Sequence, residues 1–235
     1  MILNRFEDRS VIVTGAGSGF GEATAKRFAA EGAKVVVSDI DQQSADRVVE
    51  NIVKEGGTAI SVDCDVSEES QVERLIHQAA SNHGSVDVMV NNAGYSHMSK
   101  LLWKITVEEF DAVFAVNVRG VFLGCKYVIP LMIEQKAGAI VNIASVGAIA
   151  PRAGVTPYNG TKGAVLTMTK GLAMETARHG IRVNAVNPVA AETGFMRGAM
   201  GVDQLAEADR DRLISTIPLG RMAEPIEVAA AVTSL

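Results

Sequence analysis

The chain has 235 residues, of which 48% are hydrophobic and 21% charged, an ordinary composition for a globular domain. Its formal net charge of −5 at pH 7 argues against binding to nucleic acid or to an anionic membrane surface. Neither a secretory h-region nor an uninterrupted apolar run of about 18 residues is present, so we expect no membrane span and a single cytoplasmic domain over residues 1–235. The two cysteines, Cys64 and Cys125, predict reduced thiols rather than a disulfide or metal cluster.

Short β-branched segments alternate with longer helical patterns along the chain. In order, we expect a strand at 11–14, a helix at 19–31, a strand at 34–38, a helix at 42–55, a strand at 59–62, a helix at 68–82, a strand at 86–90, a helix at 107–135, a strand at 139–143, a helix at 157–179 and a strand at 181–186. Strands that are apolar throughout and separated by helices indicate βαβ units. The fold class is therefore α/β, with a parallel sheet covered by helices on both faces in three layers.

The predicted helix at 107–135 is apolar nearly all round between Phe110 and Ile133. Such a helix is buried on more than one side. We expect one side to face the sheet and the other to face a second subunit, giving a homo-oligomer, either a dimer or a tetramer. The alternative is burial by a neighbouring helix within the monomer.

A glycine-rich run, Thr14 to Gly21, leaves the first predicted strand and opens the first predicted helix. It does not satisfy G-x-G-x-x-G, because Phe20 stands at the third glycine position; the pattern is Gly15-x-x-x-Gly19-x-Gly21. Glycines in such a turn let the backbone approach a pyrophosphate, and a helix N-terminus favours an anion. The alternative is a glycine-rich turn that binds nothing.

Asp39 ends the second predicted strand, 18 residues after Gly21. A carboxylate at about this distance accepts hydrogen bonds from an adenosine ribose and repels a 2′-phosphate. No arginine stands directly after Asp39. Ser18 occupies a loop position where a basic residue would bind that phosphate. The residues therefore favour NAD over NADP. The alternative for Asp39 is a solvated turn residue or helix N-cap.

Several motifs follow one another in an order that resembles the short-chain dehydrogenase/reductase family. They are Thr14–Gly21, Cys64-Asp65-Val66, Asn91-Asn92-Ala93-Gly94, Asn117, Ser145, Tyr158-x-x-x-Lys162, and Asn187-Pro188 with Thr193. The resemblance covers residues from about 9 to 225. Within the family, the chain most resembles 3-oxoacyl-acyl-carrier-protein reductases and NAD-dependent secondary-alcohol dehydrogenases. It makes the expected fold a Rossmann-type doubly wound sheet.

The resemblance implies a set of residues that hold NAD. The implied contacts are Gly15, Ser18, Gly19, Phe20 and Gly21 in the phosphate loop, Asp39 at the ribose, Asp65 and Val66 at the adenine, Asn91, Ala93 and Gly94 along the cofactor, Tyr158 and Lys162 at the nicotinamide ribose, and Val189 and Thr193 at the carboxamide. Val189 departs from the glycine that is commoner in the family. Asp63 and Asp65 share one face of a strand but have no further ligand near them in sequence, so no metal site is predicted.

Tyr158 and Lys162 are one helical turn apart and share a helix face, and Ser145 follows the predicted strand at 139–143. The resemblance makes Tyr158 the general acid/base and Lys162 the cation that lowers its pKa from about 10. By the same resemblance Ser145 polarises the substrate oxygen, and Asn117 positions a water that relays protons. Asn117 lies inside an apolar helix, so its amide needs a partner.

Residues 190–217 contain glycines that permit hinge motion, and methionine and phenylalanine side chains suited to an apolar substrate, so we expect a substrate lid there. The alternative is an ordinary surface helix with loose flanks. Tyr95, His97, Arg152 and Met196 are candidate pocket residues. The chain stops at Leu235 inside a predicted helix, where the family usually continues into a last strand, so an exposed sheet edge is expected.

These residues favour an NAD(H)-dependent oxidoreductase that interconverts a secondary alcohol and a ketone, with a 3-oxoacyl reductase-like character. The partner is then a small-molecule alcohol or ketone. The alternatives are a non-catalytic dinucleotide sensor on the same fold and a purely structural oligomer. No H-E-x-x-H or C-x-x-C motif is present, so no catalytic zinc is predicted.

Overall fold

A computed structural model describes residues 4–191, 193, 195 and 206–235. Six parallel strands form one sheet in the order β3-β2-β1-β4-β5-β6. The strands are β1 (Ser10–Thr14), β2 (Lys34–Asp39), β3 (Thr58–Asp63), β4 (Val88–Asn91), β5 (Gly138–Ile143) and β6 (Ile181–Val186). The chain winds outward from β1 to β3 and then crosses back to β4, which confirms the doubly wound topology.

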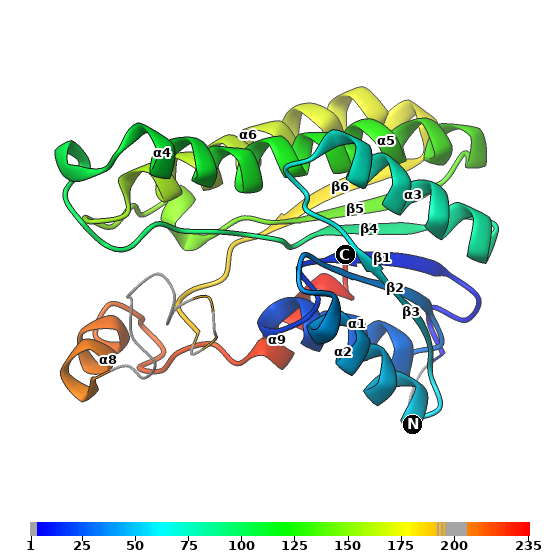
Figure 1. Cartoon of the computed structure of the whole chain (residues 1–235), viewed down its shortest axis with the longest axis horizontal. Coiled ribbons are helices and arrows are strands. Elements are labelled where there is room, and N and C mark those ends of the chain that lie inside the picture. Colours follow the sequence, from blue (N-terminus) through cyan, green and yellow to red (C-terminus); the bar gives the residue numbers. More distant parts are fainter. Residues whose placement is uncertain (1–3, 192, 194, 196–205) are drawn as a thin grey trace.

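Helices cover both faces of this sheet (Figure 1). One layer contains α1 (Gly19–Ala30), α2 (Gln42–Lys54) and α9 (Pro225–Val232); the other contains α3 (Glu69–His83), α4 (Val107–Phe114), α5 (Gly120–Gln135) and α6 (Thr156–Thr176). The 3₁₀ helices are η1 (Leu102–Lys104), η3 (Val146–Ala148) and η4 (Ala177–His179). Helix α8 (Glu207–Ile214) stands apart from both layers in Figure 1. The expected three-layer α/β fold is confirmed.

The central strands carry apolar side chains on both faces because each face meets a different helical layer. In β1, Val11 and Val13 belong to one hydrophobic core with Phe28 of α1, whereas Ile12 belongs to the other core with Leu75 of α3. All of these side chains are buried. Successive strand residues point to opposite faces, so the alternation builds both cores at once.

The expected helix at 107–135 is a continuous helical run with an irregular centre. Between α4 and α5 lies a π-helical segment, η2 (Ala115–Arg119), which the sequence pattern did not predict. By length and composition alone the run Val107–Gln135 would span a membrane, with 44% of its most apolar window buried. Core helices of globular proteins meet the same criterion, and here α5 packs on α3 while α4 packs on α6.

The start of one strand differs from expectation, and the last strand lies at the edge of the sheet. The strand expected at 86–90 begins at Val88. Before it, Val86 N–H donates to Oε1 of Gln135, and the Asp87 carboxylate accepts from Ser10 N–H while the Asp87 backbone N–H donates to Ser10 O. At the other side, β6 pairs only with β5 among the described residues, so one of its edges lacks a strand partner there.

Candidate active site

A cleft of about 1040 Å³ lies at the carboxyl ends of the strands. One side chain or loop from almost every strand end reaches it: Gly15 after β1, Asp39 at the end of β2, Ala93 after β4, Ser145 after β5 and Pro188 after β6. Backbone hydrogen bonds tie the last two strand ends together, with Ala144 N–H donating to Val186 O and Val146 N–H donating to Pro188 O. Ligands bind at this edge of parallel sheets because the loops converge there.

The backbone of the loop between β1 and α1 lies so close to neighbouring residues that some of its positions have no room for a side chain. A Cβ on Gly15, whose φ is +60°, would lie 2.7 Å from Ala93 Cα, and one on Gly21 would lie 2.2 Å from Gly15 O. Helix α1 begins with Ser18 as N-cap, and no side chain caps its first N–H groups. The result is a glycine cradle with free helix N–H donors at the cleft, which fits a pyrophosphate.

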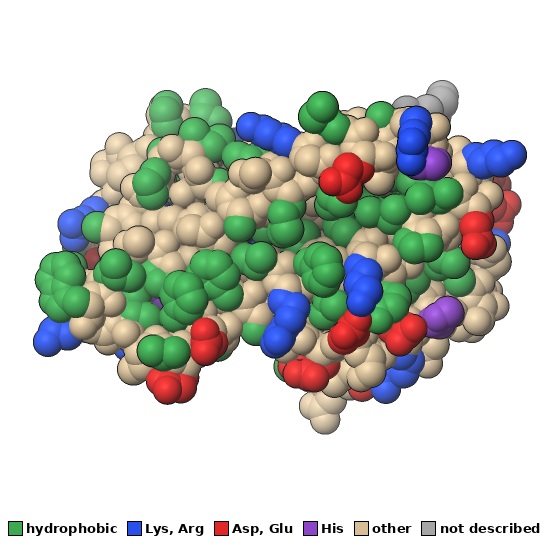
Figure 2. Space-filling model, turned by 90° about the horizontal axis from the view of Figure 1, so that it is seen from above, with side chains coloured by type: hydrophobic (Ala, Val, Ile, Leu, Met, Phe, Trp, Pro, Cys, Tyr) green, Lys and Arg blue, Asp and Glu red, His purple; other side chains and the backbone are tan. Residues whose placement is uncertain are grey.

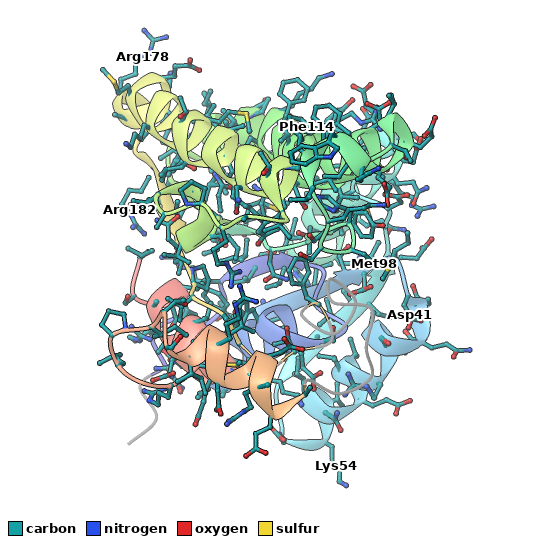
Figure 3. The ribbon with its side chains drawn as sticks, turned by 90° about the vertical axis from the view of Figure 1, so that its left-hand side faces the viewer. Asp41, Lys54, Met98, Phe114, Arg178 and Arg182 are labelled. Atoms are coloured by element: carbon teal, nitrogen blue, oxygen red, sulfur yellow. The ribbon has the colours of Figure 1, made fainter. Side chains whose placement is uncertain are left out.

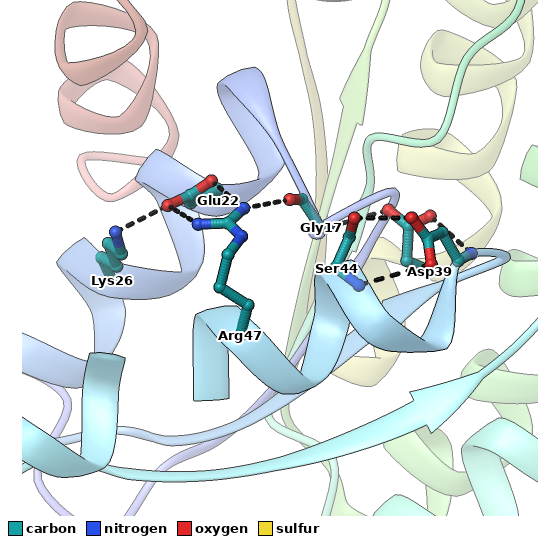
Figure 4. A network of polar contacts seen from close by, with 7 residues as sticks. Gly17, Glu22, Lys26, Asp39, Ser44 and Arg47 are labelled. Carbon is teal, nitrogen blue, oxygen red and sulfur yellow. Dashed lines mark hydrogen bonds and ion pairs between the residues drawn. The ribbon is translucent and has the colours of Figure 1, made fainter. Parts of the chain in front are cut away.

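Asp39 is held at the edge of this loop by a polar network (Figure 4). Its Oδ2 accepts from Gly17 N–H at 2.8 Å, and its Oδ1 accepts from Asp41 N–H at 3.0 Å. On the other side of the loop, Arg47 donates to Gly17 O at 2.7 Å and pairs with Glu22 at 2.8 Å. A carboxylate has about four acceptor positions, so Asp39 keeps two for the hydroxyls of a ribose.

The region expected to hold an adenine follows β3. Asp65 and Val66 line the cleft, and Oδ1 of Asp65 accepts from the backbone N–H and the hydroxyl of Ser67. Cys64 lines the cleft beside them, and burial raises the pKa of its thiol to about 11, so the thiol is protonated and a poor nucleophile. Both cysteines are free, as expected.

The segment after β4 differs from expectation at one residue. Asn91 is buried and does not line the cleft; its Nδ2 donates to Oδ1 of Asn142, its register partner in β5, at 2.8 Å. Asn92 lines the cleft instead, and its Nδ2 donates to the carbonyls of Thr14 and Gly15. It therefore ties the end of β4 to the glycine loop, a role that the sequence analysis missed.

Ser145, Tyr158 and Lys162 all line the cleft. Ser145 follows β5, and its Oγ accepts from Gly147 N–H at 3.1 Å, which orients the hydroxyl. Tyr158 lies in the first turn of α6, with Lys162 one turn further on and its Nζ 5.8 Å from the centroid of the tyrosine ring. Nζ of Lys162 donates to Ile143 O at 2.8 Å, which anchors the ammonium to the end of β5.

Burial dominates the electrostatics of this group. It raises the pKa of Tyr158 above its usual 10, and a hydrogen bond with Ser145 and the charge of Arg152 offset that only in part. Burial likewise lowers the pKa of Lys162 to about 8. We expected Lys162 to lower the pKa of Tyr158. That expectation also counted on the positive charge of the nicotinamide ring, and it stays a prediction; among the protein's own groups, desolvation of the phenolate outweighs the hydrogen bond with Ser145 and the charge of Arg152.

Asn117 does not line the cleft, and it is fully buried within η2. Its Oδ1 accepts from Tyr95 N–H at 2.8 Å, and its Nδ2 donates to Tyr95 O at 2.9 Å and to Oγ1 of Thr161 at 3.0 Å. Thr161 donates in turn to Tyr158 O at 2.7 Å. The sequence analysis expected a hydrogen-bond partner for the buried amide of Asn117. The loop after β4 and the start of α6 supply it.

The remaining expected residues gather at the end of β6. Val189 and Thr193 line the cleft, and Phe195 packs on Tyr158 with ring centroids 5.6 Å apart. Of the expected lid, 190–217, residues 192, 194 and 196–205 lie outside the described part, among them Met196. In the described part, Leu213 and Thr216 line the cleft.

Most of the expected site residues meet in this one cleft. Those lining it are Gly15, Ser18, Gly19, Phe20, Asp39, Asp65, Val66, Ala93, Gly94, Ser145, Tyr158, Lys162, Val189 and Thr193. Gly21, Asn91 and Asn117 are not among the residues that line it. Tyr95 and Arg152 line it as expected, whereas His97 is buried outside it, with Nδ1 hydrogen-bonded to Met98 O at 2.7 Å. In the described residues, no group of three or more histidine, cysteine, aspartate or glutamate side chains has a metal-binding arrangement.

The loop after β4 forms one wall of the cleft. Tyr95, Ser96, Met98 and Ser99 line it, although the residues between Tyr95 and Ser99 belong to no helix or strand. In Figure 3, Met98 lies at a level between Phe114 of the upper helical layer and Asp41 at the start of α2. Both polar and apolar side chains of this loop therefore line the cleft.

This doubly wound sheet, glycine cradle and Ser–Tyr–Lys group define a dinucleotide-binding oxidoreductase fold. The chain belongs to the short-chain dehydrogenase family, whose model, described as short chain dehydrogenase, matches residues 9–201. It is 41% identical to a 4-formylbenzenesulfonate dehydrogenase of Comamonas testosteroni, over 95% of this chain and 88% of that protein.

Two further proteins show the range of the relatives. A meso-2,3-butanediol dehydrogenase of Serratia marcescens is 36% identical over 98% of this chain and 88% of its own length. The crystal structure of a 3-ketoacyl-(acyl-carrier-protein) reductase from Brucella melitensis, complexed with NADH, superimposes with a TM-score of 0.89 at 42% identity. The match covers 97% of this chain and 90% of that one.

Proposed function

We propose that the chain is an NAD(H)-dependent oxidoreductase that interconverts a secondary alcohol and a ketone. The observation that carries this proposal is the convergence of Ser145, Tyr158 and Lys162 on the same cleft as the glycine loop. A pure binding protein has no need for a buried lysine beside a buried phenol, because burying both groups costs free energy. The relative in complex with NADH supports the choice of cofactor.

The fit of this cleft to NAD rests on its own residues. The free N–H groups at the start of α1 and the glycine loop would receive the pyrophosphate, and Asp39 would accept from the adenosine ribose. Asp65 and Val66 would contact the adenine, with Val189 and Thr193 at the nicotinamide end. When bound, the cofactor supplies or accepts the hydride, and the protein supplies position and protons.

Proton transfer is the chemistry of the chain's own side chains. Because burial raises the pKa of Tyr158, its phenol is protonated at neutral pH and ready to donate to the oxygen of a carbonyl under reduction. Ser145 would hold that oxygen through its hydroxyl, which Gly147 N–H already orients. In the oxidative direction Tyr158 must first lose its proton, and the ammonium of Lys162 stabilises the resulting phenolate.

We assign Asn117 a positioning role behind these groups. Its amide links the loop at Tyr95 to Thr161, which binds the carbonyl of Tyr158. A Cβ placed on Gly94 would lie 3.6 Å from both Oδ1 of Asn117 and Nζ of Lys162, so the amide oxygen and the ammonium both lie close to Gly94. A water between them would connect Lys162 to the interior, in agreement with the proton relay expected from the family.

The chain is also proposed to act as a cytoplasmic homo-oligomer with a substrate lid over 190–217. Phe110 and Phe122 remain 41% and 52% exposed on α4 and α5, and hydrophobic side chains gather on this helical face (Figure 2). An apolar face of this kind is covered in many oligomers. Light scattering coupled to size-exclusion chromatography tests the assembly, and a monomeric mass would contradict it.

The function is tested by following NADH oxidation at 340 nm with a panel of ketones, aldehydes and a 3-oxoacyl thioester. The panel is measured with wild type and with Tyr158→Phe, which removes only the phenolic oxygen. Turnover that the variant loses by about 10²-fold or more supports the proposal. NADH binding without turnover of any compound would favour a dinucleotide sensor instead.

A further inference from the structure

Arg152 is a charged residue of the cleft that the proposed reaction does not use. It lies in the loop between η3 and α6, and its side chain lines the cleft together with Tyr158 and Val155. The Nε of its guanidinium is buried and has no hydrogen-bond partner, and nothing in the described part of the chain forms an ion pair with it. Unpaired buried donors are rare, and in native proteins they require an explanation such as an absent ion or ligand.

The loop that carries Arg152 is fixed on both sides, so the guanidinium is held in place. Nδ2 of Asn159 in α6 donates to Arg152 O at 2.8 Å. Two residues further on, Gly154 has a φ of +85°, and its carbonyl accepts from Lys100 N–H at 3.0 Å. Because both the α6 side and the loop after β4 anchor this backbone, the side chain projects into the cleft from a defined position.

The other charges of the cleft do not neutralise Arg152. Asp39 and Asp65 lie at the strand ends that receive the adenosine half of a dinucleotide, across the sheet from Ser145. Asp209 and Arg212 line the mouth, both exposed and three residues apart on α8, where they neighbour each other. The reacting end of the cleft therefore carries an uncompensated positive charge beside Tyr158.

We propose that Arg152 binds an anionic group of the substrate, a carboxylate or a sulfonate, and so selects substrates that carry one. This inference rests on the proposed function. A guanidinium presents a planar set of donors that matches such oxyanions, and its charge does not depend on pH in the working range. The phosphates of a dinucleotide bind at α1, at the far end of the cleft, so the anion at Arg152 belongs to the substrate.

The test compares ketones that differ only in charge. One pair is 4-acetylbenzoate and 4-acetylbenzamide, which have nearly the same shape, and a second pair is 4-oxopentanoate and 4-oxopentanamide. The sulfonate 4-acetylbenzenesulfonate is the third anionic probe. Each is measured with wild type, Arg152→Met, Arg152→Lys and the matched control Arg182→Met. Arg182 is an exposed arginine of β6, distant from Met98 in Figure 3, and its substitution changes the net charge equally.

We expect wild type to prefer the anionic member of at least one pair by roughly 10- to 100-fold in kcat/KM, the range for a charge-assisted hydrogen bond. The preference should arise mainly in KM, because the anionic group of the substrate takes no part in the bond that changes. Arg152→Met should abolish it, Arg152→Lys should retain part of it, and Arg182→Met should leave it unchanged. Equal use of charged and neutral ketones by wild type, or a preference that survives in Arg152→Met, would overturn the proposal.

Calorimetric titration of the three anions separates this proposal from the proposed function. If wild type reduces none of the ketones, the oxidoreductase proposal fails on its own. Binding of an anion that is weakened about tenfold or more in Arg152→Met would still support the anion site. Equal binding by wild type and Arg152→Met, or no binding by either, would overturn it.

Discussion

Replacing Lys162 with methionine should make the cofactor-free protein more stable at neutral pH while abolishing its activity. The ammonium is completely buried, and burial lowers its pKa from 10.5 to about 8. At 1.36 kcal/mol per pKa unit, this difference corresponds to about 3 kcal/mol of destabilisation at pH 7. The hydrogen bond from Nζ to Ile143 O returns about 1 kcal/mol, so methionine should stabilise the fold by about 2 kcal/mol.

The sign of the pH dependence follows from proton binding. Between pH 8 and 10.5 the unfolded chain holds the lysine proton more tightly than the folded one, so the stability of wild type rises with pH in this window. At pH 9.5 the charge penalty falls to about 1 kcal/mol, and the advantage of the variant should almost vanish.

Urea unfolding followed by circular dichroism at pH 7 and pH 9.5 measures both quantities. Lys170→Met is the matched control, since Lys170 is exposed on the same helix α6, and its substitution should change the free energy of unfolding by less than about 0.5 kcal/mol at either pH. A Lys162→Met variant less stable than wild type at pH 7, or an advantage that does not change with pH, would refute the reasoning.

Four further predictions concern the cleft. Tyr158→Phe should lower kcat by about 10²- to 10⁴-fold while the Kd for NADH, measured by fluorescence titration, changes less than tenfold. Because burial raises the pKa of Tyr158 above its usual 10, kcat/KM for carbonyl reduction should not rise with pH and should fall only at strongly alkaline pH, whereas kcat/KM for alcohol oxidation should rise with pH; a reduction profile that rises with pH, or an oxidation profile that falls, would contradict this assignment. Gly21→Ala would place a Cβ 2.2 Å from Gly15 O, so NADH affinity should fall at least about tenfold, whereas Gly171→Ala, in α6 with nothing within 4 Å, should raise stability by about 0.5–1 kcal/mol. Asp39→Ser should shift the ratio of NADH to NADPH affinity toward NADPH, and an unchanged ratio would remove Asp39 from ribose recognition.

The order of the elements was predictable because the central strands carry apolar side chains on both faces and alternate with longer helical segments. Val35, Val36 and Val37 of β2 are all buried, which requires a helical layer on each side. The glycine loop was also predictable, since only glycine fits at Gly15 and Gly21. Local sequence carries this information, and the parallel sheet then brings the strand ends together.

The sequence could not predict features that depend on a single residue's environment. Asn91 and Asn92 are adjacent and chemically identical, but the pleat of β4 directs Asn91 toward Asn142 and leaves Asn92 at the glycine loop. The direction of the Tyr158 pKa depends on its depth of burial rather than on the spacing to Lys162. The π-helical segment at Asn117 likewise has no signature in the hydrophobic pattern.

The most direct test of the proposed oxidoreductase activity is isotope transfer. NADH deuterated at C4 of the nicotinamide is incubated with wild type and with Tyr158→Phe in the presence of the ketone panel, and the products are analysed by mass spectrometry. We expect one deuterium at the carbinol carbon of a reduced ketone with wild type, and a product yield at least about 10²-fold lower with Tyr158→Phe. Tight NADH binding by wild type with no deuterated product from any ketone would contradict the assignment of this cleft to hydride transfer.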